Sequence, residues 1–529
     1  MPASSMRRYL SVWLRRLSTD RIERRLPAPA DGPRVVVASI ASAQRIVALN
    51  DAAARLGLKT GMPLADARAM YPALPVADAD FEADRRTLEA IADWCDRYTP
   101  LVGLDPPDGL VLDVTGCAHL FGGEAVMARD LVARLKQQGF RSRIAVADTV
   151  GGAWGIARHG EQGIVRRDEI EAAVLPLPIA ALRIDAETVA ALAALGLKRI
   201  VDLRTRPRAP LAARFGEQLV RRLDQALGRE EEPITPRLPV PAAMAEQRFP
   251  EPIAREADVL GTIEHLAREL SRALERRGEG ARLIQTALFR TDGAVHRLEI
   301  GTGAPLRDPK RVRRLFQDRL ATLGDACDPG FGYDMVRLSA LVTERTDPVQ
   351  TGLAAPDDAE ELAHLIDRLG ARFGLRRVTR LMPQDTHIPE YAVAAVPAHA
   401  AASSPHPTGA GRASATRWEE GAQSPEQDSL SPARPLRLFA RPEPVDAIAQ
   451  VPDGPPVRFS WRHVTHQVVR VEGPERIAME WWRDDRGNKL TRDYFRVESD
   501  AGARVWLYRE GLYGREPGNP RWYLHGLFA

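Results

Sequence analysis

A stretch rich in alanine, serine, proline and glycine at residues 393–434 divides this chain of 529 residues into a long N-terminal part and a short C-terminal part. The stretch shows little apolar periodicity, which predicts a disordered linker. At about 150 residues per domain, the length predicts three or four domains. Hydrophobic residues make up 44% of the chain, so packed cores are expected on both sides of the linker.

The pattern before the linker changes twice. Up to about residue 170, strand patterns such as 109–114 alternate with helical patterns such as 83–97, which indicates α/β or α+β structure. Residues 176–230 are helical and contain two helices joined by a turn at Gly196. The amides of such a turn can hold a DNA phosphate, although ordinary helical cores contain the same pattern. Residues 245–345 combine helices with an Asp-Gly hairpin, which predicts a compact α+β module.

The C-terminal part is rich in tryptophan. Residues 456–529 contain Trp461, Trp481, Trp482, Trp506 and Trp522, out of nine tryptophans in the whole chain. Alternation of apolar and polar residues predicts a small β-rich domain. The aromatic side chains either fill its core or bind a partner.

Composition excludes several classes of protein. No apolar run reaches the ~20 residues that span a bilayer, and the N-terminus has no apolar segment of a secretory signal. Cys95, Cys117 and Cys327 are widely spaced, which argues against a disulfide framework or a zinc knuckle and favours a reducing cytoplasm. A net charge of +3 neither requires nor excludes a nucleic-acid partner.

Three segments resemble the Y-family DNA polymerases, which carry out translesion synthesis. Ile46–Asp66 is similar to the fingers segment of the family, Tyr98–Gly116 to the palm segment that ends in Asp-Val-Thr-Gly, and Arg143–Ile156 to the palm strand and helix that follow. The resemblance implies a multidomain right hand of α/β and α+β domains. Its expected parts are the palm (7–33 and 76–172), the fingers (34–75), a helix-hairpin-helix thumb (173–238), the little finger (243–346), an extension with a clamp motif and a helix (347–392), the linker (393–434) and a C-terminal partner-binding domain (456–529).

The resemblance also shows what the catalytic centre lacks. Nucleotidyl transfer needs two divalent cations held by carboxylates. Trp13 and Arg15 stand where the family has the aspartates of its first strand, and Gly109 replaces the glutamate beside Asp108. An indole or a guanidinium does not bind a hard cation. We therefore expect a degenerate centre with no metal, no cofactor and no polymerase activity.

The nucleotide contacts are also replaced. The triphosphate-binding tyrosine, arginine and lysine of the family fall at Asp51, Ala54 and Trp154, and Asp51 is expected to repel a triphosphate. An alternative hypothesis is a residually active polymerase in which Asp20 and Glu23 substitute for the missing ligands.

The remaining aspartates of this region have a simpler interpretation. Asp105, Asp108 and Asp113 are expected to be turn and strand-end residues, and Asp113 is expected to support the Asp-Val-Thr-Gly turn.

Leu112–Glu124 and three C-terminal segments, Thr491–Glu498, Ala503–Glu516 and Arg521–Ala529, are similar to the ImuB family, a catalytically inactive group of Y-family-like mutagenesis proteins of bacteria. This resemblance implies an adaptor in the SOS response to DNA damage, in the cytoplasm and on the nucleoid after damage. The implied partners are DNA, the sliding clamp (β subunit), the α subunit of an error-prone replicative-type DNA polymerase, and the accessory protein ImuA.

Two segments are candidates for clamp binding, which uses a glutamine followed by aliphatic and aromatic residues. Gln350 and Leu353 match the first and fourth positions of such a peptide. Leu436, Leu438 and Phe439 match its end, although a proline replaces the glutamine. For either segment the alternative is a linker edge that packs on its neighbour.

DNA contact is expected from the little finger. Arg282, Arg290 and Arg297 belong to the predicted hairpin, and Lys310 and Arg313 to the basic helix that follows. Phosphate contacts of this kind give affinity that is independent of sequence and sensitive to salt. The alternative for the basic helix is that its charged face is simply solvated. The alternative for the whole chain is a DNA-binding protein that acts without the clamp.

Overall fold

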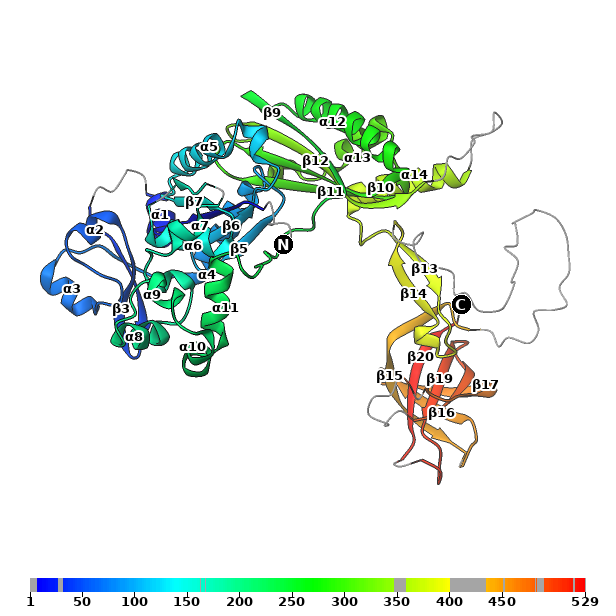
Figure 1. The fold of residues 1–529 in the computed structure, drawn as a ribbon. Coiled ribbons are helices and arrows are strands. Elements are labelled where there is room, and N and C mark those ends of the chain that lie inside the picture. The colour runs from blue at the N-terminus through cyan, green and yellow to red at the C-terminus, as the bar shows by residue number, and fades with distance from the viewer. Residues whose placement is uncertain are drawn as a thin grey trace. The chain divides into compact units, whose positions relative to one another are not determined.

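A computed structural model describes residues 7–26, 32–161, 163–166, 168–346, 358–399, 434–450, 452–480, 482, 490–516 and 519–528 (Figure 1). The chain forms two compact units, Met1–Leu375 and Arg376–Ala529, and each has its own hydrophobic cores. The described residues include no helix that is long and apolar enough to cross a membrane. The predicted class, a multidomain α/β and α+β fold, is confirmed.

The centre of the N-terminal unit is a five-stranded sheet. Its strands, in spatial order, are β5 (Val102–Asp105), β6 (Gly109–Asp113), β1 (Tyr9–Trp13), β7 (Arg143–Ala147) and β8 (Gly163–Ile164). Strand β1 lies in the middle and is almost entirely buried, because helices cover both faces. Helices α4 (Phe81–Cys95) and α5 (Glu124–Gln137) pack on one face, and α6 (Val150–His159) packs on the other. The antiparallel register places Trp13 opposite Gly109.

A smaller layer follows β1 and helix α1 (Leu17–Glu23). It contains the sheet β3-β2-β4 and two helices: β2 (Val35–Ile40), β3 (Ala43–Leu49), α2 (Asp51–Arg55), α3 (Leu64–Met70) and β4 (Val76–Asp78). The Asn50 side chain caps α2 by accepting a hydrogen bond from the Ala53 N–H. This cap fixes Asp51 in the first turn of the helix.

A helical region joins this part to the next sheet. Its helices are α7 (Ile170–Val174), α8 (Ala186–Ala194), α9 (Ile200–Arg204), α10 (Arg208–Phe215) and α11 (Glu217–Ala226). The predicted pair of helices is present as α8 and α9. Gly196 between them has a φ of 80°, which an L side chain rarely adopts, so a glycine is needed there.

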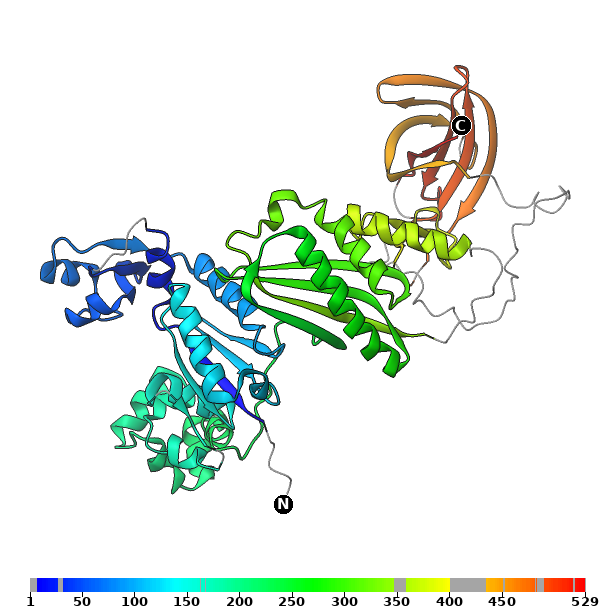
Figure 2. The ribbon, with the colours of Figure 1, turned by 90° about the horizontal axis from the view of Figure 1, so that it is seen from above.

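The last part of the N-terminal unit is a four-stranded antiparallel sheet in the order β11-β10-β12-β9. Its elements are β9 (Ala243–Ile253), α12 (Glu256–Arg277), β10 (Glu279–Arg290), β11 (Val295–Leu306), α13 (Pro309–Leu320), β12 (Tyr333–Arg345) and α14 (Asp358–Phe373). Figure 2 shows α12 and α13 lying across one face of this sheet, where they bury its apolar residues. The predicted Asp-Gly hairpin is formed by β10 and β11.

The C-terminal unit is a closed six-stranded barrel with a separate hairpin. The barrel strands are β15 (Arg437–Ala449), β16 (Pro456–Trp461), β17 (Val464–Ile477), β18 (Arg492–Ser499), β19 (Arg504–Glu510) and β20 (Arg521–Leu527). Strands β13 (Thr379–Pro383) and β14 (Val393–Pro397) form the hairpin. Short 3₁₀ helices complete the chain at Ala118–Phe121, Ile179–Leu182, Gly324–Cys327 and Pro389–Tyr391.

Two sequence-based boundaries need correction. The barrel begins at Arg437 rather than at residue 456, because β15 pairs with both β16 and β20 and is needed to close it. Residues Val393–Pro397, expected at the start of the linker, form β14 and pair with β13. Residues 400–433 of the expected linker lie outside the described residues.

Candidate functional site

Trp13, expected from the sequence at the position of a catalytic aspartate, contacts Asp108. Trp13 ends β1, and its indole Nε1–H donates a hydrogen bond of 2.9 Å to Asp108 Oδ2. Asp108 lies in the turn between β5 and β6, directly before Gly109. The indole therefore lies beside the carboxylate that a metal would need.

Arg158 on α6 completes this arrangement. Its Nη2 lies 2.9 Å from Asp105 Oδ2 and 3.4 Å from Asp108 Oδ1. Trp154, one helical turn earlier, donates from Nε1 to Asp105 Oδ2 at 2.7 Å. The Arg158 guanidinium lies 4.2 Å from the ring centre of Trp154 and 5.7 Å from that of Trp13. We call Trp13, Asp105, Asp108, Trp154 and Arg158 the aspartate–arginine centre.

Burial shapes the electrostatics of this centre. It raises the pKa of Asp108, and the hydrogen bond from Trp13 and the charge of Arg158 oppose that rise. Burial also lowers the pKa of Arg158, against the charges of Asp105 and Asp108. The guanidinium is nonetheless protonated at neutral pH, because the reference pKa of arginine is above 12. The Arg158 guanidinium thus interacts with the carboxylates of both Asp105 and Asp108.

The space around Gly109 is too small for a side chain as the neighbouring residues stand. A Cβ atom at Gly109 would lie 2.5 Å from Arg158 Nη2 and 2.6 Å from Asp105 Oδ2. These distances are far below van der Waals contact, so a glutamate could enter only if Arg158 moved. The residues present do not fit a two-metal centre.

The other acidic residues do not fill the gap. In the described part of the chain, no three His, Cys, Asp or Glu side chains gather closely enough to hold a metal ion. Asp20 accepts a 2.8 Å hydrogen bond from the Arg141 N–H, and Glu23 accepts one from Asn50 Nδ2. These bonds hold both carboxylates at sites other than the aspartate–arginine centre.

Asp113 has the structural role that the sequence predicts. Its Oδ1 accepts a hydrogen bond of 2.9 Å from the Thr115 N–H in the turn after β6.

Asp51, one of the three positions predicted for lost nucleotide contacts, lies in an ion cluster with three arginines. Asp51 Oδ1 accepts from Arg15 at 2.6 Å and from Arg16 at 2.8 Å, and Oδ2 accepts from Arg141 at 2.7 Å. Burial alone would raise the pKa of Asp51, but the arginines lower it to about 2. The sequence predicted that Asp51 would repel a triphosphate; in the structure three arginines pair with its charge. Ala54 is exposed on α2 and contributes no polar group.

A cavity of about 890 Å³ lies beside these residues, between α1, α4 and β3. Its charged lining residues are Arg15, Arg16, Lys59, Asp84, Arg85 and Asp108. Trp13 and Asp108 of the aspartate–arginine centre line it as well, and leucines of β3 and α4 supply apolar walls.

The three predicted DNA-contacting arginines of the hairpin are all bonded within the protein. Arg282 is buried, donates to the carbonyl oxygen of Gly303 and pairs with Glu344 at 3.3 Å. Arg290 pairs with Asp292 at 2.6 Å and donates to the Asp328 carbonyl oxygen at 3.0 Å.

Arg297 belongs to an ion network between the four-stranded sheet and the end of α4. Its guanidinium lies 2.6 Å from Asp93 Oδ1 and 2.5 Å from Asp96 Oδ2. In the same contact, Arg97 pairs with Asp334 at 2.9 Å, and both side chains are less than one-tenth exposed. Arg297 therefore joins two parts of the N-terminal unit.

The other two candidates for DNA contact lie on the outer face of α13. Lys310 and Arg313 are exposed there, beside exposed Arg314. Arg313 makes only a long contact of 3.6 Å to Glu264. These side chains are available to a phosphate backbone.

The two clamp candidates differ in what the structure describes. Gln350 and Leu353 lie outside the described residues. Leu436 is 90% exposed, whereas Leu438 and Phe439 already belong to β15. The Phe439 ring stacks on the Trp461 ring, with 6.3 Å between the ring centres, and packs against the barrel core. The second candidate is thus part of a folded strand.

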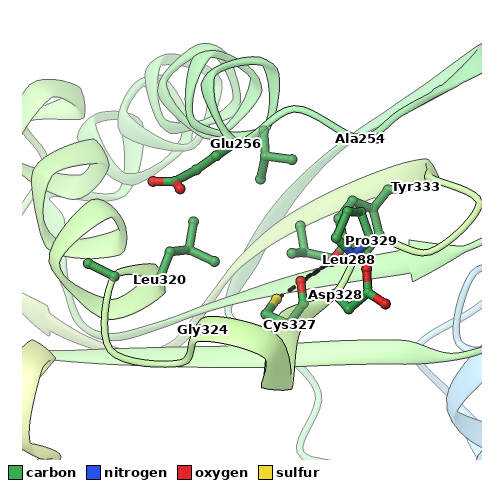
Figure 3. A pocket seen from close by; sticks show the side chains of 11 residues that line it. Ala254, Glu256, Leu288, Leu320, Gly324, Cys327, Asp328, Pro329 and Tyr333 are labelled. Carbon is green, nitrogen blue, oxygen red and sulfur yellow. Dashed lines mark hydrogen bonds between the residues drawn. The ribbon is translucent and has the colours of Figure 1, made fainter.

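A second cavity, of about 530 Å³, opens between the start of α12 and the end of α13 (Figure 3). Leu288 and Leu320 line it together with Glu256, and Tyr333 Oη donates to the Cys327 carbonyl oxygen at 3.1 Å. The described lining residues include none of the predicted contacts to DNA or the clamp.

Sequence reasoning missed Arg158, Arg16 and Arg141. A pattern for Arg158 was available, because an arginine four residues after Trp154 faces the same side of a helix. Arg16 and Arg141 come from segments 125 residues apart, and only the fold brings them to Asp51.

Comparisons with known proteins agree with this architecture. Residues 20–157 match the impB/mucB/samB family, and residues 440–528 match a domain of unknown function, DUF6504. Protein ImuB of Caulobacter vibrioides (strain NA1000 / CB15N) is 42% identical over 484 residues, which cover 90% of this chain and all of that protein.

More distant proteins match the N-terminal part. DNA polymerase IV of Alkalilimnicola ehrlichii is 26% identical over 327 residues, or 60% of this chain and 88% of that protein. Among solved structures, the insertion ternary complex of Dbh DNA polymerase covers 63% of this chain and 99% of its own, with a TM-score of 0.40 and 17% identity.

The fold and the family match define a Y-family polymerase-like protein with a separate C-terminal β-barrel. Its similarity to the Caulobacter protein extends through nearly the whole chain. The chain belongs to the ImuB family, and this membership supports a role related to DNA-damage mutagenesis.

Proposed function

We propose that this chain is a non-catalytic, Y-family-like adaptor in translesion synthesis and mutagenesis induced by DNA damage. It links DNA and the sliding clamp to an error-prone DNA polymerase, which adds the nucleotides. The observation that carries the proposal is the pairing of Arg158 with Asp105 and Asp108. An internal cation pairs with Asp108, the one carboxylate that a polymerase would offer to its metal ions, and with the neighbouring Asp105.

A guanidinium does not replace those metals in function. Two-metal catalysis needs open coordination positions that bind the attacking and leaving oxygens. The Arg158 guanidinium lies near two indoles and offers only N–H donors, and Trp13 donates a hydrogen bond to one oxygen of the Asp108 carboxylate. The centre thus stabilises the fold and does not activate a primer terminus.

In this proposal, DNA binds along the outer face of α13. Lys310, Arg313 and Arg314 are exposed there, within two turns of one helix. Neutralising phosphates with such side chains gives affinity without sequence preference. Arg282, Arg290 and Arg297 are assigned to internal pairing instead, because each has a carboxylate partner within 3.3 Å.

The clamp contact is assigned to Gln350 and Leu353 rather than to Leu436, Leu438 and Phe439. Clamp binding requires a free extended peptide, whereas Phe439 packs on Trp461 in a barrel strand. Pull-down of the full chain by the β subunit of the clamp tests this assignment. We expect Gln350→Ala with Leu353→Ala to abolish capture and Leu436→Ala to leave it unchanged. Capture that persists in the double variant would favour a DNA-binding protein that acts without this clamp peptide.

The barrel is proposed as the surface for the polymerase α subunit and ImuA. Its strands β15 and β17 expose apolar side chains, among them Ile448 at 57% and Val469 at 64%. Exposed apolar residues on a small domain are candidate partner contacts. We expect Ile448→Glu with Val469→Glu to reduce pull-down of one or both partners while clamp capture continues. Unchanged capture of both proteins would place their contact elsewhere.

A further inference from the structure

Helix α14 packs on the four-stranded sheet with its polar side and exposes its apolar side. The side that packs on the four-stranded sheet is small and polar, with Asp367 only 2% exposed. Asp367 Oδ1 accepts a hydrogen bond of 2.5 Å from the Gly303 N–H, and Oδ2 lies 3.7 Å from Arg311. Gly370 and Ala371 are buried beside it. The helix is held to its own sheet by a carboxylate and close backbone approach.

The other side of α14 carries the apolar residues. Leu362, Leu365 and Phe373 are 55%, 50% and 58% exposed, and Ile366 and Leu369 lie between them, partly exposed. Their spacing of three and four residues places all five on one stripe of the helix. A surface helix normally buries such a stripe in its own core, but among the described residues of the N-terminal unit nothing covers this one.

The charges beside the stripe are separated along the helix. Glu361 lies at its N-terminal end and Arg372 toward its C-terminal end, whereas Arg368 already pairs with Asp318 at 3.1 Å. Two copies of such a helix complement each other when they run antiparallel, because the acidic end of one meets the basic end of the other. A parallel pair would place like charges together.

We propose that α14 is a self-association surface, on which a second copy of this chain binds with its own α14 antiparallel. Packing the apolar stripe of one α14 against that of the other determines which residues lie opposite each other. Leu362 lies opposite Phe373 of the second copy, and Ile366 lies opposite Leu369. Glu361 then pairs with Arg372 of the second copy, twice by symmetry. This inference is independent of the adaptor role.

The size of the contact sets its strength. One helix from each copy buries less than the ~1,600 Å² of a standard protein interface. The dimer is therefore weak, and its population depends on the concentration of the protein.

Sedimentation velocity of the full chain over a range of concentrations tests the proposal. We expect a reversible monomer–dimer equilibrium that Leu365→Glu with Phe373→Glu weakens at least tenfold. The matched control is Leu120→Glu, since Leu120 is equally exposed, at 62%, but lies far from α14 in the sequence and fold. A chain that stays monomeric, or a dimer that tolerates both α14 substitutions, would overturn the proposal.

Charge exchange and cross-linking test the orientation. Glu361→Arg and Arg372→Glu should each weaken the dimer several-fold, and the double variant should recover it. Leu362→Cys mixed with Phe373→Cys should form an intermolecular disulfide. Leu362→Cys alone should not, because 11 residues of helix separate the two sulfurs by roughly 16 Å along the axis. Efficient cross-linking of Leu362→Cys to itself would contradict the antiparallel arrangement.

Discussion

Trp13 donates its indole N–H to Asp108 Oδ2 at 2.9 Å, so the end of strand β1 is bonded to the turn before Gly109. Arg158 and Trp154 engage Asp105 in the same way. The substitutions at this centre are therefore coupled. They form a bonded cluster that stabilises the strand end and the turn before Gly109.

This coupling predicts that restoring the carboxylates alone does not restore metal binding. Trp13→Asp with Gly109→Glu rebuilds the ligand set, but the new Cβ at 109 collides with Arg158 at 2.5 Å. We expect no Mn²⁺ binding by electron paramagnetic resonance below millimolar concentrations of the ion. Adding Arg158→Ala removes the nearest obstacle and the competing charge; Asp105, whose Oδ2 lies 2.6 Å from that Cβ, must then shift, and the triple variant should give a detectable site.

Circular dichroism of both variants is the control for folding. Tight Mn²⁺ binding by the double variant, with Arg158 in place, would show that Arg158 does not occupy the centre.

Arg297→Ala is expected to destabilise the N-terminal unit by about 3–5 kcal/mol, because it leaves the buried carboxylate of Asp96 without its closest partner. Chemical denaturation and limited proteolysis measure the loss. Arg313→Ala is the matched control, since Arg313 is exposed and its contact to Glu264 is long, and it should change stability by less than about 0.5 kcal/mol. Equal stability of the two variants would contradict the interpretation of Arg297 as an internal contact.

The same face of α13 is expected to control DNA affinity. Lys310→Ala with Arg313→Ala should weaken binding to any DNA sequence and lower the salt dependence by about two ion equivalents. Fluorescence anisotropy at several salt concentrations measures both effects. An unchanged salt slope would remove α13 from the DNA interface.

Asp20 predicts a dependence of stability on pH. Burial raises its pKa to about 6, against the hydrogen bond from the Arg141 N–H. Between about pH 4 and pH 6 the folded state binds this proton more tightly than the unfolded state, so the free energy of unfolding falls as pH rises through that range. Asp20→Asn keeps an oxygen for the Arg141 N–H and removes the titration. Relative to the wild type, the variant should gain on the order of 1 kcal/mol between pH 4 and pH 7.

Denaturation at both pH values, followed by tryptophan fluorescence, checks this. A difference between variant and wild type that does not change with pH would refute a raised pKa at Asp20.

The sequence predicted the elements with strong local patterns. The Asp-Gly hairpin, the helix pair around Gly196 and the strand that contains Val111 depend on short-range periodicity and turn chemistry, and all three are present. The interpretation of Trp13 and Gly109 as replaced ligands stays a prediction that depends on the resemblance.

The sequence could not show which arginines pair with which aspartates, because the partners lie far apart in the chain. Arg158 reaches Asp105 across 53 residues, and Arg297 reaches Asp96 across 201 residues. The sequence identified basic residues but not which ones the fold neutralises. Strand β15 was missed because its prolines and exposed residues hide the alternation of a barrel strand.

Primer extension by the full chain tests the central claim most directly. The reaction contains a primed template, all four deoxynucleotides and Mg²⁺ or Mn²⁺, and the Asp108→Ala variant is purified in parallel. A non-catalytic adaptor predicts no extension above the trace found equally in the variant. Extension by the wild type that Asp108→Ala abolishes would contradict it, because Asp108 would then serve a catalytic metal rather than Arg158 and Trp13.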